Sequence, residues 1–217
     1  MRVLVACEYS GRVREAFRKL GHQAWSCDLL PAEDGSPFHY QGDVEDYIEG
    51  AWDLLIGHPP CTYLTNAGVR HLHSTPSVNG VLPKVHGAVR WEAMKEAAAF
   101  FNLLKNAAVE RIAIENPIPH RYARDLIGKY DQIIQPWQFG HGETKATCLW
   151  LKNLPKLIPT EVVEGRTHRI HMMPPGPDRW KERSRTFQGI ADAMAFQWGG
   201  MIADNDNLPL FRQAEAS

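Results

Sequence analysis

The sequence lacks the cysteine patterns that mark zinc sites and disulfide-rich proteins. Its four cysteines, Cys7, Cys27, Cys61 and Cys148, lie far apart in the 217 residues, and none is part of a CxxC pair. A chain of this length, with 44% hydrophobic residues, can bury a core without cross-links. We therefore expect free thiols, no bound metal and a reducing, cytoplasmic location.

Long hydrophobic runs are also absent. The apolar residues at the N-terminus are interrupted by Glu8, so they are too few for the core of a signal peptide. The longest later run, residues 97–104, is broken by Asn102 and cannot span a bilayer. We expect a protein without a membrane partner.

A strong net charge is the third absence. The chain carries 24 Lys and Arg against 25 Asp and Glu, so no overall field attracts nucleic acid. Two segments are locally basic: no acid occurs between Asp53 and Glu92, and residues 166–185 contain six basic residues against Asp178 and Glu182. Such clusters are typical either of solvated loops or of a local contact with phosphate groups.

Strand-like and helix-like segments alternate along the chain, which predicts an α/β domain with a mainly parallel sheet. Strands are expected at residues 2–7, 24–27, 52–57, 111–115, 130–135 and 147–151, and helices at residues 11–20, 89–107 and 186–198. We assign residues 1–202 to a single catalytic domain.

Three segments lack a clear period. Residues 62–87 are longer than most loops, so we expect a mobile loop at the active site. The prolines in residues 164–181 exclude a helix or a central strand where they cluster. Residues 203–217 are expected to form a flexible tail.

Two of the expected strands end in chemically capable side chains. Cys61 follows an apolar run and the pair Pro59-Pro60, and Glu115 ends a second apolar run before Asn116-Pro117. Ligands bind at the carboxyl ends of strands in open α/β sheets, so the thiol and the carboxyl predict an active site. The alternatives are an inert core cysteine and a structural cap.

We expect the acid-free segment around Cys61 to lower the pKa of its thiol. A thiolate can add to C6 of a pyrimidine, which prepares C5 to accept a methyl group, while Glu115 stabilises the ring charge at N3. Acyl transfer would need a His–Asn or His–Asp partner for Cys61, and the spacing of the histidines identifies none.

A cofactor site is predicted at the first two strands. The turn from Glu8 to Gly11 precedes a helix, an arrangement that offers backbone N–H groups to a ligand. Asp28 follows about twenty residues later, where an acid can bind the hydroxyls of a ribose, and Asp43 is a candidate for an adenine amino group. Because the turn has only one glycine, we favour a nucleoside cofactor without phosphates, such as S-adenosylmethionine. The alternative is a plain turn with Ser10 as the helix N-cap.

The motifs Pro60-Cys61 and Glu115-Asn116 resemble the Pro-Cys and Glu-Asn motifs of the DNA cytosine-5 methyltransferase family, and the order of the parts is similar across residues 2–199. The resemblance implies a Rossmann-like S-adenosylmethionine-dependent methyltransferase fold, with a mainly parallel seven-strand sheet and helices on both faces. It also implies methyl transfer from S-adenosylmethionine to C5 of cytosine. The partner would be single- or double-stranded DNA or a free cytosine nucleotide.

The resemblance also assigns residues to roles. The catalytic residues would be Pro60, Cys61, Glu115 and Asn116. The cofactor would contact Cys7, Glu8, Tyr9, Ser10, Gly11, Asp28, Leu29, Asp43, Pro59, Thr186 and Gln188. The substrate would contact Arg70, Lys84, Lys145, Arg183 and Arg185.

The chain departs from the family pattern at several points. His58 replaces a glycine, and Lys145 stands in place of a missing Gln-Arg-Arg motif, as a substitute phosphate contact. The large target-recognition region is reduced to residues 164–181, so we expect a degenerate sequence preference and a use of single-stranded or nucleotide substrates. A catalytically inactive, methyltransferase-like nucleic-acid-binding protein is one alternative. An amino-methyltransferase is another, although those enzymes need an aromatic residue where Cys61 stands.

Overall fold

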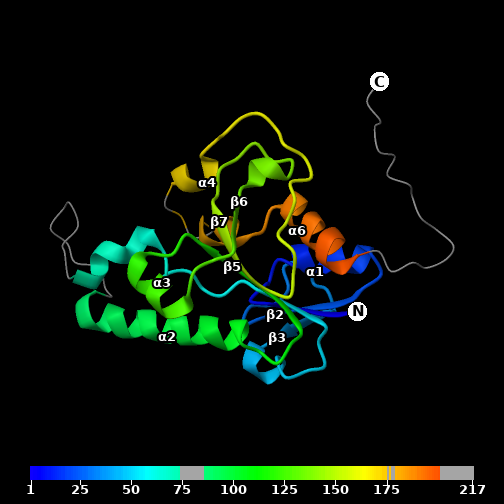
Figure 1. Cartoon of the computed structure of the whole chain (residues 1–217), viewed down its shortest axis with the longest axis horizontal. Helices are drawn as coiled ribbons and strands as arrows, with labels where there is room; N and C mark the ends of the chain where they lie inside the picture. The colour runs from blue at the N-terminus through cyan, green and yellow to red at the C-terminus, as the bar shows by residue number, and fades with distance from the viewer. Residues whose placement is uncertain (74–85, 175, 177–178, 201–217) are drawn as a thin grey trace.

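The computed structural model describes residues 1–73, 86–174, 176 and 179–200, and a seven-stranded sheet forms its centre (Figure 1). The strand order is β3-β2-β1-β4-β5-β7-β6. The bounds are β1 Arg2–Ala6, β2 Gln23–Asp28, β3 His39–Gln41, β4 Leu54–Gly57, β5 Arg111–Pro117, β6 Gln132–Ile134 and β7 Thr147–Lys152. Only β7 is reversed, because it pairs antiparallel with both β5 and β6. This is the α/β Rossmann-like methyltransferase fold that the sequence predicted.

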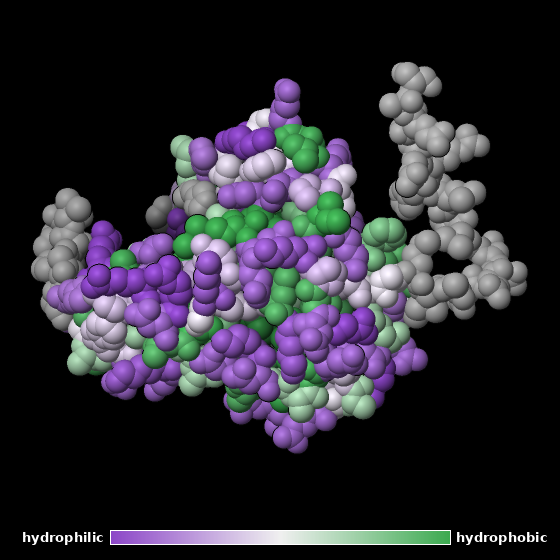
Figure 2. Space-filling view, in the orientation of Figure 1, coloured by the Kyte–Doolittle hydropathy of each residue, from purple (hydrophilic) through white to green (hydrophobic). Residues whose placement is uncertain are grey.

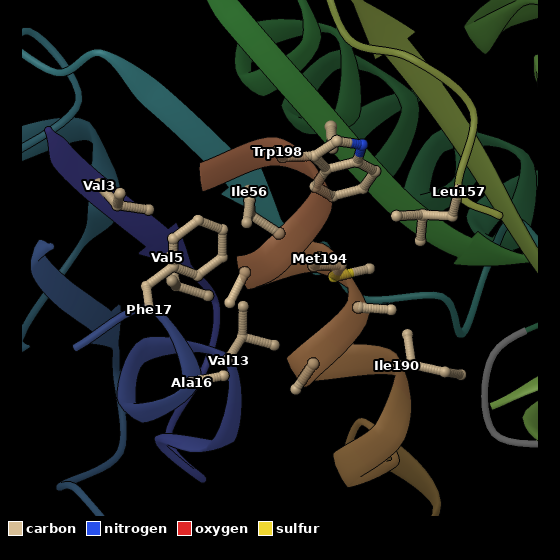
Figure 3. Packing of buried hydrophobic residues seen from close by; sticks show 14 of the residues in the cluster. Val3, Val5, Val13, Ala16, Phe17, Ile56, Leu157, Ile190, Met194 and Trp198 are labelled. Atoms are coloured by element: carbon tan, nitrogen blue, oxygen red, sulfur yellow. The ribbon is translucent and has the colours of Figure 1, made fainter. Parts of the chain in front are cut away.

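Helices cover both faces of the sheet. One face packs against α1 (Arg12–Lys19), α6 (Gln188–Met194) and the π-helical turn η4 (Ala195–Gly199). The other packs against α2 (Gly87–Lys105) and α3 (Arg121–Ile127). In Figure 3, Phe17 of α1 and Met194 of α6 lie against Val5 and Ile56 of the strands.

The residues of β1 explain why it lies at the centre. Val3 and Val5 belong to the core on one face, whereas Leu4 and Ala6 belong to the core on the other. All four side chains are fully buried, as expected for a parallel strand that is covered by helices on both sides. The shorter helices lie nearer the surface, namely η1 Val44–Asp46, η2 Asn66–His73, η3 Pro136–Gln138, α4 Arg169–Met172 and α5 Arg179–Ser184. Hydrophilic residues cover much of the face shown in Figure 2, and no helix of the described chain is long and apolar enough to cross a membrane.

The sequence predicted most of these elements but not all. The six expected strands and three expected helices are present, with ends that differ by a few residues. β3 and α3 were not predicted, and η2 lies in a segment that was expected to be irregular. The expectation of an irregular segment at 164–181 is wrong where α4 and α5 form. Residues 74–85 and 203–217, with their expected loop and tail, lie outside the described residues.

The sheet topology directs two groups of loops to one edge. The chain moves outward from β1 to β2 and β3, and then returns to β4 on the other side of β1. This change of direction leaves a crevice outside the carboxyl ends of β1 and β4. Because β7 is reversed, Thr147 at its start pairs with Pro117 at the end of β5, so the loop before β7 reaches the same edge.

Candidate active site

The register between β4 and β5 brings a histidine to the predicted catalytic carboxylate. Gly57 pairs with Ile114, so the next residues, His58 and Glu115, follow side by side as the strands end. His58 Nδ1 lies 2.8 Å from Glu115 Oε2, and the two side chains are only 9% and 13% exposed. From the sequence, His58 was noted as a departure from the family pattern, but its pairing with Glu115 was not predicted.

The contact stabilises the charged forms of both groups. Burial alone would lower the pKa of His58, but the hydrogen bond and the charge of Glu115, with a smaller effect of Glu8, raise it above 6.5. Burial alone would raise the pKa of Glu115, yet His58 and then Lys145 lower it below 4.5. The pair is therefore a buried imidazolium and carboxylate. His58 Nε2 is buried and makes no hydrogen bond with the described residues.

Cys61 lies in a turn that is tied to the end of β5. Asn116 Nδ2 donates to the Pro59 carbonyl at 3.1 Å. His120, just before α3, lies 3.0 Å through Nε2 from the Tyr63 carbonyl, and its backbone N–H donates to the Leu64 carbonyl. These bonds hold the chain on both sides of Cys61 against the residues that follow Glu115. The position of Cys61 is thus set by two neighbouring strand ends.

The expectation of a lowered thiol pKa is wrong. Burial, and then the charge of Glu115, raise the pKa of Cys61, whereas Lys145 and Arg183 lower it by less. The acid-free run around Cys61 could not reveal Glu115, which comes from another strand. A thiolate at this position would therefore need these two cations, or a base, to form.

Lys145 and Thr186 meet Glu115 in a small cavity. It is lined by Glu115, Lys145, Thr147 and Thr186, together with apolar residues of α6. Lys145 Nζ donates to the Arg185 carbonyl at 3.2 Å. Burial lowers the pKa of Lys145, and the charges of Glu115 and Cys61 oppose that shift. Lys145, predicted from the sequence as a substrate contact, thus lies beside both proposed catalytic groups.

The predicted cofactor acids lie together at the ends of β2 and β3. After burial, Asp28 and Asp43 both contribute to the raised pKa of Cys7, which follows β1 with a left-handed φ of 59°. Asp28 Oδ1 accepts from the Leu30 backbone N–H, and the Leu29 backbone N–H is a second donor to this carboxylate. Asp43 Oδ1 accepts from the Glu45 N–H and caps η1. Leu29, beside Asp28, is 72% exposed.

The start of α1 differs from the predicted arrangement. Glu8, only 5% exposed, accepts from the Val13 N–H at 2.7 Å and from the Arg14 N–H at 3.2 Å. These donors were expected to face a ligand, but a carboxylate of the chain itself occupies them. The suggested cap, Ser10, donates to Glu8 at 3.4 Å instead, and Gly11 is the N-cap, with a left-handed φ of 70° and no side-chain bond.

The end of residues 164–181, the segment predicted to be a shortened recognition region, lies against the turn that was predicted to contact the cofactor. The Tyr9 hydroxyl donates to the Lys181 carbonyl at 3.2 Å, and its ring lies 5.9 Å from the ring of Trp180. Arg185 pairs with Glu33 and Glu182, so two carboxylates already hold this predicted substrate contact.

The remaining predicted residues are not part of the contacts described above, and one of them cannot be placed. Arg70 is exposed on η2, where it contacts His71, and Gln188 contacts Asp192 on α6. Pro60 is exposed in the turn before Cys61, and Lys84 lies outside the described residues. Within the described ranges, no group of three or more His, Cys, Asp or Glu could hold a metal ion.

Comparison with known proteins gives matches in structure only. No protein-family model matches the chain, and no curated protein matches it. Three similar solved structures are an Escherichia coli prophage protein described as a DNA modification methyltransferase, the Entamoeba histolytica methyltransferase EhMeth and a mutant of Spodoptera frugiperda DNMT2. Identities are 14%, 10% and 12%, with TM-scores of 0.47, 0.47 and 0.42. The matches cover 81%, 76% and 76% of this chain.

The chain spans little more than half the length of these proteins, at 55%, 57% and 57%. Their low identities and TM-scores carry no argument about activity. The chain resembles the DNA cytosine methyltransferases in its motifs, and methyltransferases are among the solved structures to which it is similar.

Proposed function

We propose that this protein transfers a methyl group from S-adenosylmethionine to C5 of cytosine, through a covalent bond between Cys61 and C6. The observation that carries the proposal is the convergence of Cys61, Glu115 and Lys145 at one sheet edge, where the charges of Glu115 and Lys145 act on the thiol. Cytosine presents a ring nitrogen and an exocyclic amine side by side. The Glu115 carboxylate can accept a hydrogen bond from the amine, and the imidazolium of His58 can supply, through Glu115, a proton for the ring nitrogen.

The residues near Asp28 support a cofactor that carries a ribose and no phosphate. Asp28 ends β2 with a carboxylate that backbone N–H groups hold in place, and Leu29 beside it offers an exposed apolar side chain. Glu8 accepts from the N–H groups at the start of α1, so these donors are already occupied and are not available to a phosphate. S-adenosylmethionine has the ribose and lacks the phosphates, and it supplies an electrophilic methyl group when bound.

The chemistry of the chain's own residues follows from this arrangement. The thiol of Cys61 loses its proton, assisted by the charges of Lys145 and Arg183, and its sulfur bonds to C6. Electrons of the C5–C6 double bond move into the ring, and a proton that the His58–Glu115 pair supplies through Glu115 binds N3. Bound S-adenosylmethionine would supply the methyl group to C5, with the electrons of the broken S–C bond staying on a neutral thioether. A base removes the C5 proton, and N3 returns its proton to Glu115. Expulsion of the Cys61 thiolate restores the double bond.

A second candidate is a methyltransferase-like protein that binds nucleic acid without catalysis. The raised pKa of Cys61 favours it, because an unactivated thiol adds slowly to a pyrimidine. Binding of S-adenosylmethionine separates the two candidates, since an inactive scaffold would not need the cofactor.

We predict that wild-type protein binds S-adenosylmethionine and that Asp28→Ala weakens this binding by about 1–3 kcal/mol, the cost of leaving polar partners unsatisfied. Isothermal titration calorimetry measures both affinities. Asp53→Ala is the matched control, because Asp53 accepts from the Arg2 N–H at the opposite sheet edge. Equal affinities of wild type and Asp28→Ala would show that the cofactor lies elsewhere.

We also predict that the enzyme methylates single-stranded DNA or a free cytosine nucleotide better than duplex DNA. The described part of residues 164–181 offers few groups to read bases: Arg169 pairs with Glu143, and Arg166 donates to two backbone carbonyls. Unpaired substrates also avoid the cost of unstacking a base. The assay compares methylation of duplex DNA, single strands and dCMP over a range of salt. A strong preference for one long duplex site, with a steep salt dependence, would contradict this prediction.

A further inference from the structure

We propose that Trp180 is a stacking platform for an unpaired base that neighbours the target cytosine in a single-stranded substrate. This inference extends the proposed function by giving the substrate a second contact. Trp180 lies in α5, a helix without any buried residue, and 49% of its surface is exposed. A tryptophan in such a helix contributes little to the core, so its ring is available to a ligand.

Contacts on the inner side fix the position of the ring. Tyr9 is only 8% exposed, and its ring lies 5.9 Å from that of Trp180 at an angle of 49°. The Tyr9 hydroxyl also contacts the Lys181 carbonyl at 3.2 Å and Ser184 Oγ at 3.4 Å. Arg185, just after α5, is paired with Glu33. The ring is therefore held against the body of the protein before any substrate binds.

The helix also links the ring to the reaction site. Lys145 Nζ donates to the carbonyl of Arg185, the residue just after α5, at 3.2 Å, and Lys145 lines one cavity with Glu115 and Thr186. This end of α5 therefore lies near the proposed catalytic groups, and the charge of Arg183 acts on Cys61. Trp180 precedes Arg183 by three residues, and side chains at this spacing are neighbours on a helix surface. The exposed ring thus lies about one helical turn from Arg183, at the end of α5 that leads to the cavity beside Glu115.

The chemistry of this surface suits single-stranded nucleic acid. Lys181 Nζ lies 5.8 Å from the Trp180 ring centroid, and Arg179 is the other neighbour of Trp180 in the chain. Aromatic rings that stack on bases, beside cations that contact phosphates, form the usual surface for single strands. A base in a duplex is already stacked and paired, so this platform selects for unpaired substrates.

The test measures the binding of labelled oligothymidine with one central cytosine, by fluorescence anisotropy, to the full-length protein. Trp180→Ala is expected to weaken binding by about five- to 150-fold, the range for the loss of one base–aromatic stack, whereas Trp180→Phe keeps most of the affinity. Phe196→Ala, which removes an exposed aromatic ring on η4, is the matched control and should bind as the wild type does.

A second pair of ligands tests the neighbouring base itself. Replacing the nucleotide on one side of the cytosine by an abasic site should weaken binding to the wild type, yet cause no further loss in Trp180→Ala. Equal affinities of wild type and Trp180→Ala for the intact oligonucleotide would overturn the proposal, as would additive losses. The proposal would also be overturned if Trp180→Ala weakened the binding of S-adenosylmethionine or dCMP as much as that of the oligonucleotide. The ring would then contact the cofactor or the target base. These measurements need no turnover, so a failure of the methyl-transfer proposal is seen separately.

Discussion

Cys61→Ser is expected to lower methyl transfer by on the order of 10⁴-fold or more, as the loss of a nucleophile does in other covalent enzymes. A serine hydroxyl stays protonated where even a perturbed thiol ionises in part, so it cannot add to C6. Binding of S-adenosylmethionine and the free energy of unfolding should change little, because Asn116 and His120 hold the turn through its backbone. Radioactive methyl transfer to a cytosine oligonucleotide measures the loss.

A trapping experiment checks the same bond directly. An oligonucleotide with 5-fluorocytosine should form a denaturant-resistant adduct with the wild type, since fluorine cannot leave C5 as a proton does. Cys148→Ala, which changes a buried thiol in β7, is the control and should still form the adduct. An adduct with Cys61→Ser, or its normal turnover, would rule out the thiol mechanism.

The raised pKa of Cys61 adds an expectation about rate. Adduct formation should become faster as the pH rises, because more of the thiol ionises, until the pH reaches the value at which His58 loses its proton. Lys145→Gln removes one of the two cations that lower this pKa, so it should slow adduct formation at neutral pH and lose part of the deficit at high pH. If Lys145→Gln formed the adduct as fast as the wild type at every pH, Lys145 would not assist ionisation of Cys61.

Glu115→Gln is the second substitution with a large expected effect, a loss of about 10²–10⁴-fold in kcat, the usual contribution of a general acid or base. The amide keeps the size of the carboxyl but cannot pass a proton between His58 and N3 of the ring. Methyl transfer to dCMP and to a single-stranded oligonucleotide measures the loss, with cofactor affinity as the control. A kcat within tenfold of the wild type would show that Glu115 does not act on the ring.

His58→Gln tests the role of the histidine as a positioning residue for Glu115. Glutamine can still donate to Glu115 but cannot titrate. The pKa of His58 is raised, so the wild type should lose activity as the pH rises through a value above 6.5, and this alkaline limb should be absent in His58→Gln. A purely structural role would lower activity equally at every pH.

The His58–Glu115 pair should also make the free energy of unfolding depend on pH. Glu115, with a lowered pKa, stabilises the fold above pH 4.5 and loses this effect as the pH falls through its folded value. His58, with a raised pKa, stabilises the fold below pH 6.5 and loses this effect as the pH rises through its folded value. Urea unfolding should therefore separate His58→Gln from the wild type most clearly between pH 4.5 and 6.5.

The fold was predictable because its central strands are strongly apolar, and the exceptions have simple causes. Residues 39–41 of β3 read His-Tyr-Gln at the sheet edge, where burial does not impose an apolar run. The seven residues of α3 follow Pro119 and are capped by the His120 side chain, a cap outside the common Ser, Thr, Asp and Asn set.

The site was predictable only where a residue ends its own strand. Cys61, Glu115 and Asp28 follow apolar runs, so each could be placed at the active edge. The pairing of His58 with Glu115 depends on which strands are neighbours, and the capping of α1 by Glu8 depends on how the turn folds back. The thiol pKa of Cys61 combines burial with charges from two other parts of the chain. None of these is a local property of the sequence.

The reversed strand β7 sets a limit on how small such a protein can become. β7 begins beside the end of β5 and finishes with Lys152 beside Ile112, so it carries the chain about 20 Å away from the active edge. The chain must travel back before Thr186 can line the cavity beside Glu115, and it does so partly alongside residues 139–143. Residues can be removed from this connection, but the return path cannot. If the link between Lys152 and Thr186 were too short to return to this edge, Thr186 and α6 could no longer pack against the sheet.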